Sequence, residues 1–137
     1  MYVMRQLVQV TESRKNMNIK SSKAKGRKLQ NLVRDELNSC GYHTRATLMG
    51  ESGVDVSGYD CEWGIECKAV ESLNVWAALE QAEHNAKERN LIPALAFKRN
   101  RTDAYITLRL SDFIELVKQR NTFVIRANGP QLPAGSA

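Results

Sequence analysis

An alternation of apolar and polar residues over positions 61–69 constrains the fold of this chain more than any other feature. Five alternate positions carry side chains suited to a buried face: Cys61, Trp63, Ile65, Cys67 and Ala69. The positions between them form the opposite face: Glu62, Gly64, Glu66 and Lys68. A period of two is that of a β-strand, so the chain must build a sheet around this segment.

The residues before this strand predict one helix and two further strands. An apolar stripe at helical spacing indicates a helix over residues 22–40: Leu29, Leu32, Val33, Leu37 and Cys40. Residues 42–48 and 54–57 are predicted as short strands on the basis of their β-branched and aromatic content. We expect these strands to form an antiparallel meander with residues 61–69.

The residues after it predict a crossover to a second part of the sheet. A helix is expected to begin at Asn74 as N-cap, with Trp76 in the core and a buried stripe of Val75, Leu79, Ala82 and Ala86. Residues 91–97 are almost wholly apolar, which is typical of a central strand buried on both faces. A strand over 104–109 and a helix from Ser111 follow. The order predicts an α/β fold with an αβββαβ core, in which helices flank a mixed sheet.

The two ends of the chain are predicted to lie outside this core. Residues 1–20 are interpreted as a basic N-terminal arm, with a strand over 2–10 as an alternative. A last edge strand fits residues 122–126. Residues 127–137 contain two runs rich in Gly and Pro and are expected to be disordered. The folded domain therefore spans residues 21–126.

Positive charge is concentrated in two segments of a chain whose formal net charge is +5. No acidic residue occurs between Ser13 and Val33, and a second basic cluster follows residue 97. Such clusters favour an anionic partner, and basic side chains that grip phosphates position DNA without specifying its sequence. The candidates are Lys23, Lys25, Arg27, Lys28, Lys98, Arg99 and Arg101. The alternative is a solvated surface with an unstructured basic arm.

The cysteines and histidines argue against a disulfide framework and a zinc site. Cys40, Cys61 and Cys67 show no CxxC spacing, and the chain has only two histidines, His43 and His84, which do not complete a set of paired Cys and His ligands. An odd number of cysteines is typical of a reducing compartment. No segment approaches the roughly 20 apolar residues needed to span a bilayer. We therefore expect a cytoplasmic protein with no membrane partner.

Three polar side chains supply the parts of a metal-dependent hydrolytic site. Glu66 and Lys68 lie two residues apart and share a strand face, and Asp55 reaches Glu66 if its strand pairs through the Gly58 turn. The two carboxylates and the carbonyl of Cys67 would form an all-oxygen site of the kind that Mg²⁺ prefers. Lys68 would orient the attacking water or stabilise charge in the transition state. This chemistry fits phosphodiester hydrolysis.

The same pattern also fits an ordinary antiparallel strand whose Glu and Lys side chains face solvent. Three features favour the hydrolytic site instead. Gly53 allows a tight turn before Asp55, Gly64 leaves room on the polar face for a ligand or for backbone to approach, and basic clusters flank the motif on both sides.

Four short motifs, in the order of the predicted elements, resemble the PD-(D/E)xK nuclease superfamily. They are Lys25-Gly26-Arg27 with Leu29-Gln30, Ser52-Gly53-Val54-Asp55, Ile65-Glu66-Cys67-Lys68, and Leu79-Glu80-Gln81-Ala82. Over about residues 22–117, the chain is most similar to small phage-encoded nucleases and archaeal-type Holliday junction resolvases. The resemblance implies a restriction-endonuclease-like fold, Mg²⁺ or Mn²⁺ as cofactor, and endonucleolytic hydrolysis of DNA. Asp55 and Glu66 would be metal ligands and Lys68 the catalytic lysine.

The resemblance also implies a biological setting and some departures. Resolvases of this type act as two-fold homodimers on branched DNA in recombination, and a phage-encoded one acts in the host cytoplasm. They place a glutamate in the first helix, where this chain has Gln30. Glu36 is the other candidate, on the apolar stripe, unless its carboxylate reaches solvent. Gln81 would anchor the site or contact a phosphate, or it is an ordinary surface glutamine.

Two other hypotheses remain open at this point. The missing acid in the first helix fits a non-catalytic DNA-binding protein on a nuclease-like fold. A basic module for an acidic protein partner is the third hypothesis, in which the Glu/Lys strand face is simply solvated. A steep loss of DNA affinity with salt would count against this third hypothesis.

Overall fold

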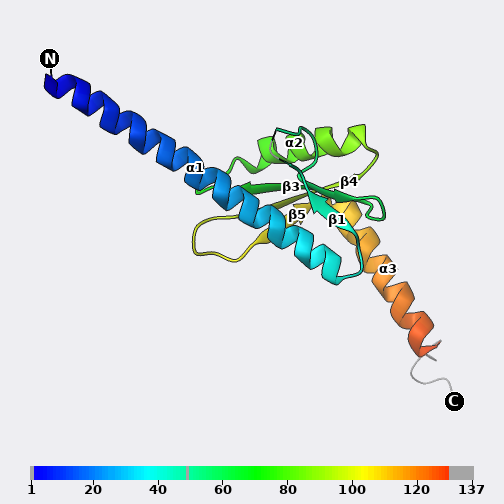
Figure 1. Cartoon of the computed structure of the whole chain (residues 1–137). Coiled ribbons are helices and arrows are strands. Elements are labelled where there is room, and N and C mark those ends of the chain that lie inside the picture. The colour runs from blue at the N-terminus through cyan, green and yellow to red at the C-terminus, as the bar shows by residue number, and fades with distance from the viewer. Residues whose placement is uncertain (1, 49, 130–137) are drawn as a thin grey trace. The chain divides into compact units, whose positions relative to one another are not determined.

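The computed structural model describes residues 2–48 and 50–129, with side chains from residue 21 onward. Its elements are α1 (Tyr2–Ser39), β1 (Thr44–Ala46), β2 (Val56–Gly58), β3 (Trp63–Ala69), α2 (Val75–Glu88), β4 (Ile92–Lys98), β5 (Tyr105–Leu108) and α3 (Leu110–Asn128), as Figure 1 shows. The chain divides into two units, residues 1–107 and residues 108–137. The first carries α1, α2 and all but the last residue of the sheet, and the second carries α3.

The sheet mixes antiparallel and parallel pairing, as predicted. Its strand order is β1-β2-β3-β4-β5. The first two strands pair antiparallel, β2 joins β3 antiparallel through Val56 and Ile65, and β3 pairs with β4 in parallel along its whole length. Parallel neighbours need a crossover, which α2 supplies. The predicted N-cap of α2 is confirmed, because Asn74 Oδ1 accepts a hydrogen bond from the Ala77 N–H at 3.1 Å.

Strand β3 is buried on both faces. Ile65 and Cys67 on one face are 2% and 7% exposed, and Glu66 on the other is 3% exposed. Three small residues at helical spacing on α2 are buried: Ala78, Ala82 and Ala86. The alternative in which the Glu and Lys side chains face solvent is therefore excluded at Glu66.

Gly64 allows a close approach to β3 by the protein itself, one of the two alternatives that its sequence position indicated. A Cβ at this residue would lie 3.2 Å from the Cβ of Leu91 and 3.3 Å from the Cβ of Ala86. The missing side chain therefore lets α2 and Leu91, in the loop after α2, pack closely against β3. The other alternative, that Gly64 leaves space for a ligand, is wrong.

Helix α1 is longer than predicted, because it begins at Tyr2. Residues 2–20 are helical, so the alternative strand over 2–10 is not formed. No glycine or proline occurs before Gly26, and the segment contains many good helix formers. Local preference thus continues the helix that the apolar stripe predicted only from residue 22.

Helix α3 replaces the edge strand predicted over residues 122–126. Its N-cap is Arg109 instead of Ser111, and it runs through Ala127 to Asn128. The remainder of the predicted tail, residues 130–137, lies outside the described residues. Across the described part of the chain, no helix is both long enough and apolar enough to cross a membrane.

Candidate functional site

The loop before β2 brings Asp55 to the edge of β3. Asp55 Oδ2 accepts a hydrogen bond from the Cys67 N–H at 2.8 Å. The Asp55 carbonyl accepts hydrogen bonds from the Thr47 N–H at 2.8 Å and from Thr47 Oγ1 at 2.7 Å. These contacts fix the aspartate between the end of β1 and the middle of β3. The predicted approach of Asp55 to the Glu66 segment is therefore present.

Glu66 is held from two sides within the same site. Lys68 Nζ lies 3.3 Å from Glu66 Oε1, and the Lys68 side chain is 29% exposed. From α2, Asn85 Nδ2 donates to Glu66 Oε2 at 3.4 Å and to the Gly53 carbonyl at 3.3 Å. The three predicted catalytic residues are thus brought together, with one amine and one amide oriented toward the buried glutamate.

The two carboxyl groups share a poorly solvated environment. Burial raises the pKa of Asp55 above its ordinary value, against the hydrogen bond from Cys67 and the positive charges of Lys68 and Arg27. Burial, and then the negative charge of Asp55, raise the pKa of Glu66, while Lys68 acts in the opposite direction. In the absence of a further cation, the fully ionised pair is therefore unfavourable.

Cys67 contributes backbone groups to this site. Burial raises the pKa of its thiol, and the charges of Asp55 and Glu66 raise it further, so the sulfur stays protonated at neutral pH. The N–H and the carbonyl of one strand residue point to the same strand edge, and the Cys67 N–H points to Asp55. The Cys67 carbonyl is therefore directed to the same edge as the aspartate.

Two carboxylates alone are too few ligands for a hard divalent cation, so a metal site here would also need backbone or amide oxygens. Nowhere in residues 2–48 and 50–129 do three or more His, Cys, Asp or Glu side chains form a group that could hold a metal. Gln30 offers a candidate amide oxygen, because its Oε1 is buried and has no hydrogen-bond partner among the described residues. It lies one helical turn beyond Arg27, whose charge acts on Asp55. Two carboxylates, a carbonyl and an amide oxygen are ligands that Mg²⁺ and Mn²⁺ accept.

The other predicted auxiliary residues lie away from these contacts. Glu36 is exposed, which confirms the alternative that its carboxylate reaches solvent and takes it out of the buried stripe of α1. The stripe is narrow, since Leu29 is 1% exposed but Leu32 is already 44% exposed. Gln81 is exposed on α2, one turn before Asn85.

Asn85 is a site residue that the sequence analysis missed. It occurs seven residues after Ala78, on the helical face that the buried alanines define. A polar side chain on an otherwise buried alanine stripe is a signal that the sequence contains. The predicted stripe obscured it: Ala82 and Ala86 are buried as predicted, but the stripe continues through Ala78, and Val75 is 37% exposed.

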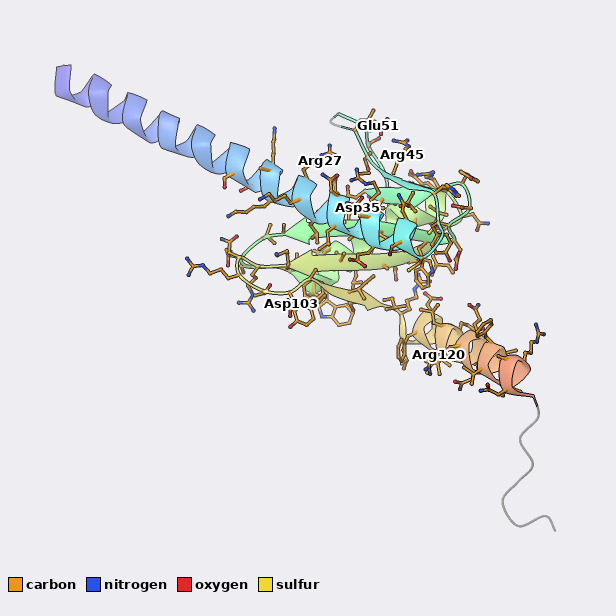
Figure 2. All side chains as sticks on the ribbon, turned by 60° about the horizontal axis from the view of Figure 1, so that its bottom comes forward. Arg27, Asp35, Arg45, Glu51, Asp103 and Arg120 are labelled. Carbon is orange, nitrogen blue, oxygen red and sulfur yellow. The ribbon has the colours of Figure 1, made fainter. Side chains whose placement is uncertain are left out.

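The predicted phosphate-binding residues are divided between two places. Arg27 NH1 donates to the Thr47 carbonyl at 2.6 Å, and Figure 2 shows Arg27 on α1 near the loop that carries Glu51. Lys23 is exposed on α1. The other five residues lie around one cavity between α1 and the end of β4: Lys25, Lys28, Lys98, Arg99 and Arg101. The fold thus joins the two basic clusters of the sequence.

Comparisons of this chain with protein-family models, with curated proteins and with solved structures found no match.

Proposed function

We propose that this protein is a metal-dependent endonuclease of the PD-(D/E)xK type that hydrolyses phosphodiester bonds in DNA. The observation that carries the proposal is the convergence of the buried Glu66 on β3 with the half-buried Asp55 from the loop before β2 and with Lys68 Nζ, which lies 3.3 Å from Glu66 Oε1. Two carboxyl groups that share one positive charge in a poorly solvated environment cost free energy, and acids perturbed in this way are candidates for a functional site. A restriction-endonuclease-like arrangement, with the aspartate before β2 and the Glu-x-Lys motif in β3, is part of this proposal.

Asp55, Glu66 and the Cys67 carbonyl would hold the Mg²⁺ or Mn²⁺ ion, and the Gln30 amide oxygen would supply a neutral donor. The bound ion would lower the pKa of a water molecule and offset negative charge on the phosphoryl oxygens. The amine of Lys68 places a fixed positive charge beside Glu66, where it stabilises charge that develops in the transition state. Asn85 limits rotation of the Glu66 carboxylate.

The surroundings of the site support DNA as the substrate. Arg27 lies on the Asp55 side, and five further cations surround the cavity between α1 and β4. Basic side chains of this kind bind the sugar–phosphate backbone, so we expect recognition of DNA shape instead of a long base sequence. Cleavage of branched DNA by a two-fold homodimer, as in junction resolvases, is the most specific form of the proposal.

Cleavage assays on three DNA shapes test this function. The protein is incubated with a linear duplex, a single strand and a four-way junction of matched sequence, each with Mg²⁺, Mn²⁺ or EDTA. We expect metal-dependent nicking by the wild type, strongest on the junction, and its loss in Lys68→Ala. Absence of cleavage on every substrate, or full activity of Lys68→Ala, would refute the proposal.

One observation favours a second function, a DNA-binding protein without nuclease activity. Among the described residues, the site has two acids, and the helix position where resolvases carry a third holds the neutral Gln30. A pure binder has no need of a cation. It would bind the junction with steep salt dependence while Mg²⁺ released no heat in calorimetry.

Asn85→Ala is expected to reduce the cleavage rate by roughly tenfold to a hundredfold, because residues that orient catalytic or metal-binding side chains have effects of this size. The variant should retain the fold, since Asn85 is only partly buried. Glu80→Ala, an exposed position on the same helix, is the control and should cleave like the wild type. Rates measured at saturating Mn²⁺ on one substrate give the comparison; equal rates would exclude a role for Asn85.

A further inference from the structure

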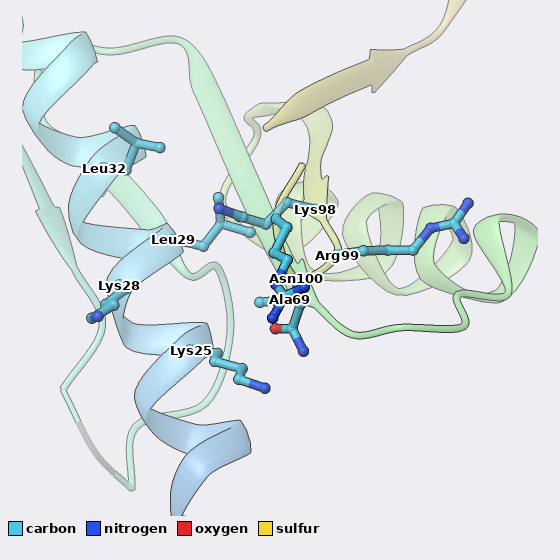
Figure 3. A pocket seen from close by; sticks show the side chains of 9 residues that line it. Lys25, Lys28, Leu29, Leu32, Ala69, Lys98, Arg99 and Asn100 are labelled. Atoms are coloured by element: carbon cyan, nitrogen blue, oxygen red, sulfur yellow. The ribbon is translucent and has the colours of Figure 1, made fainter. Parts of the chain in front are cut away.

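A basic cavity with a volume of about 330 Å³ lies between α1 and the turn after β4, and it is distinct from the carboxylate pair. Cationic residues come to it from both segments: Lys25, Lys28, Lys98, Arg99 and Arg101. None of the described residues that line it is acidic. Its apolar surface is provided by Leu29, Leu32 and Ala69. The cavity thus combines concentrated positive charge with an apolar wall (Figure 3).

The cavity adjoins the candidate catalytic strand. Ala69 follows Lys68 directly, and in the parallel register Ala69 lies opposite Lys98. Successive strand residues point to opposite faces, so the cavity opens on the other face of β3 from Lys68. In Figure 3, Lys25 extends from α1 toward the turn after β4, whereas Arg99 extends away from α1. The cations to test are Lys25 on α1, Lys98 at the end of β4 and Arg101 in the turn that follows.

The turn after β4 is held in a defined conformation. The Asn100 N–H donates to Glu71 Oε1 at 2.9 Å, and the Arg99 N–H donates to Thr102 Oγ1 at 3.1 Å. Arg101 has a φ of 60°, in the left-handed region that favours glycine. Retaining an arginine there costs free energy relative to glycine. This cost is understandable if the Arg101 side chain binds a ligand.

The size and charge of the cavity select one class of ligand. An internal phosphodiester of a duplex carries one negative charge, and its base is paired. A terminal phosphomonoester carries close to two charges at neutral pH. A volume near 330 Å³ falls at the small end of ligand sites and matches one nucleotide better than a duplex. The apolar wall suits a sugar or an unpaired base.

We propose that this cavity binds the terminal, unpaired nucleotide of a DNA strand, with its phosphomonoester among Lys25, Lys98 and Arg101 and its sugar or base against Leu32 and Ala69. This inference rests on DNA being the substrate of the proposed function, and it adds recognition of a phosphorylated strand end to that function. The strand end would lie close to Lys68 in the chain and on the opposite face of β3.

Fluorescence anisotropy with Glu66→Gln protein in EDTA tests the cavity without any cleavage. The probes are hairpin duplexes with a single-stranded overhang that ends in a 5′-phosphate, a 3′-phosphate or a hydroxyl, and a blunt hairpin. We expect a terminal phosphate to tighten binding about tenfold, since charge-assisted hydrogen bonds to a second phosphate charge are added. The two phosphorylated overhangs identify which strand end is bound.

Matched variants in the same background separate the cavity from general charge. Lys98→Met and Arg101→Gly should lose the phosphate preference. Lys23→Met removes an equal charge from α1 outside the cavity lining and should keep the preference. Asn90→Gly controls for the change to glycine, because Asn90 also has a positive φ, of 54°, and lies outside the cavity. Both glycine variants should melt no lower than their parent.

Three results would overturn the inference. The first is equal affinity of the parent for phosphorylated and hydroxyl ends. The second is an equal loss of the phosphate preference in Lys23→Met and Lys98→Met, which would indicate diffuse attraction. The third is full competition by a free nucleoside monophosphate at the concentration of the DNA, which would indicate a site for free nucleotides. Because cleavage is not measured, an inactive nuclease would leave these outcomes unaffected.

Discussion

Asp55→Asn is expected to lower the rate of DNA cleavage by about a thousandfold or more. The substitution keeps the size of the side chain but removes one of two charges that would hold the cation, and metal catalysis contributes several kcal/mol to such reactions. The amide oxygen can still accept the hydrogen bond from the Cys67 N–H, so the loop before β2 should keep its position. The effect is therefore expected on the rate and not on the fold.

Single-turnover cleavage of a labelled junction in Mn²⁺ measures this effect. Asp60→Asn is the matched control, because Asp60 also lies near β2 but is exposed and pairs with His43 at 2.8 Å. It should cleave at the wild-type rate. If the Asp55→Asn protein retained more than about a tenth of wild-type activity, Asp55 would not be a ligand of the catalytic metal ion.

The second large effect is expected for Glu66→Gln, which should stabilise the metal-free protein but abolish its stabilisation by metal. Glu66→Gln should raise the melting temperature of the metal-free protein, with a gain of about 1 kcal/mol, because a buried group that resists ionisation is replaced by a neutral one. The amide oxygen introduced by this substitution can still accept hydrogen bonds from Lys68 and Asn85. The same variant should show no stabilisation by Mn²⁺.

For the wild type, saturating Mn²⁺ should stabilise the fold by about 2.7 kcal/mol at a hundredfold excess over Kd, since ligand binds only the folded state. The pKa values of Asp55 and Glu66 are raised in the folded protein. Their contribution to metal-free stability is therefore complete below the ordinary carboxyl pKa of about 4 and is lost as pH rises through the higher folded values. The metal should recover that loss.

Melting curves at pH 5 and pH 8, with EDTA or Mn²⁺, distinguish these effects. Glu62→Gln is the control, because Glu62 is exposed and precedes the same strand. We expect it to behave like the wild type in both buffers. A metal-free Glu66→Gln protein that melts well below the wild type would show that Glu66 has a structural role, and a Mn²⁺ shift in that variant would place the ion elsewhere.

The sequence predicted much of the sheet because its signals are local. The alternation over 61–69 identified β3, and Asn74 identified the start of α2 through a side-chain cap that needs no tertiary context. The apolar run over 91–97 identified β4 as a buried parallel strand. The convergence of Asp55 and Glu66 followed from strand pairing alone.

Other features depend on packing that no local pattern contains. The burial of Glu66 results from α2 covering β3, and the role of Gly64 appears only when the distance to Ala86 is known. Trp76, expected in the core, is 79% exposed because it lies outside the alanine stripe of α2. Residues 122–126 contain several β-branched side chains, which predicted a strand, but they form part of helix α3.

The central claim is that Asp55 and Glu66 together hold a divalent cation, and anomalous diffraction from crystals grown with Mn²⁺ tests it most directly. The account predicts an anomalous peak between the two carboxylates, about 2.1–2.2 Å from an oxygen of each, and no such peak in Asp55→Asn crystals. An ordered pair of carboxylates with no peak between them, in crystals of active or inactive protein, would contradict the account.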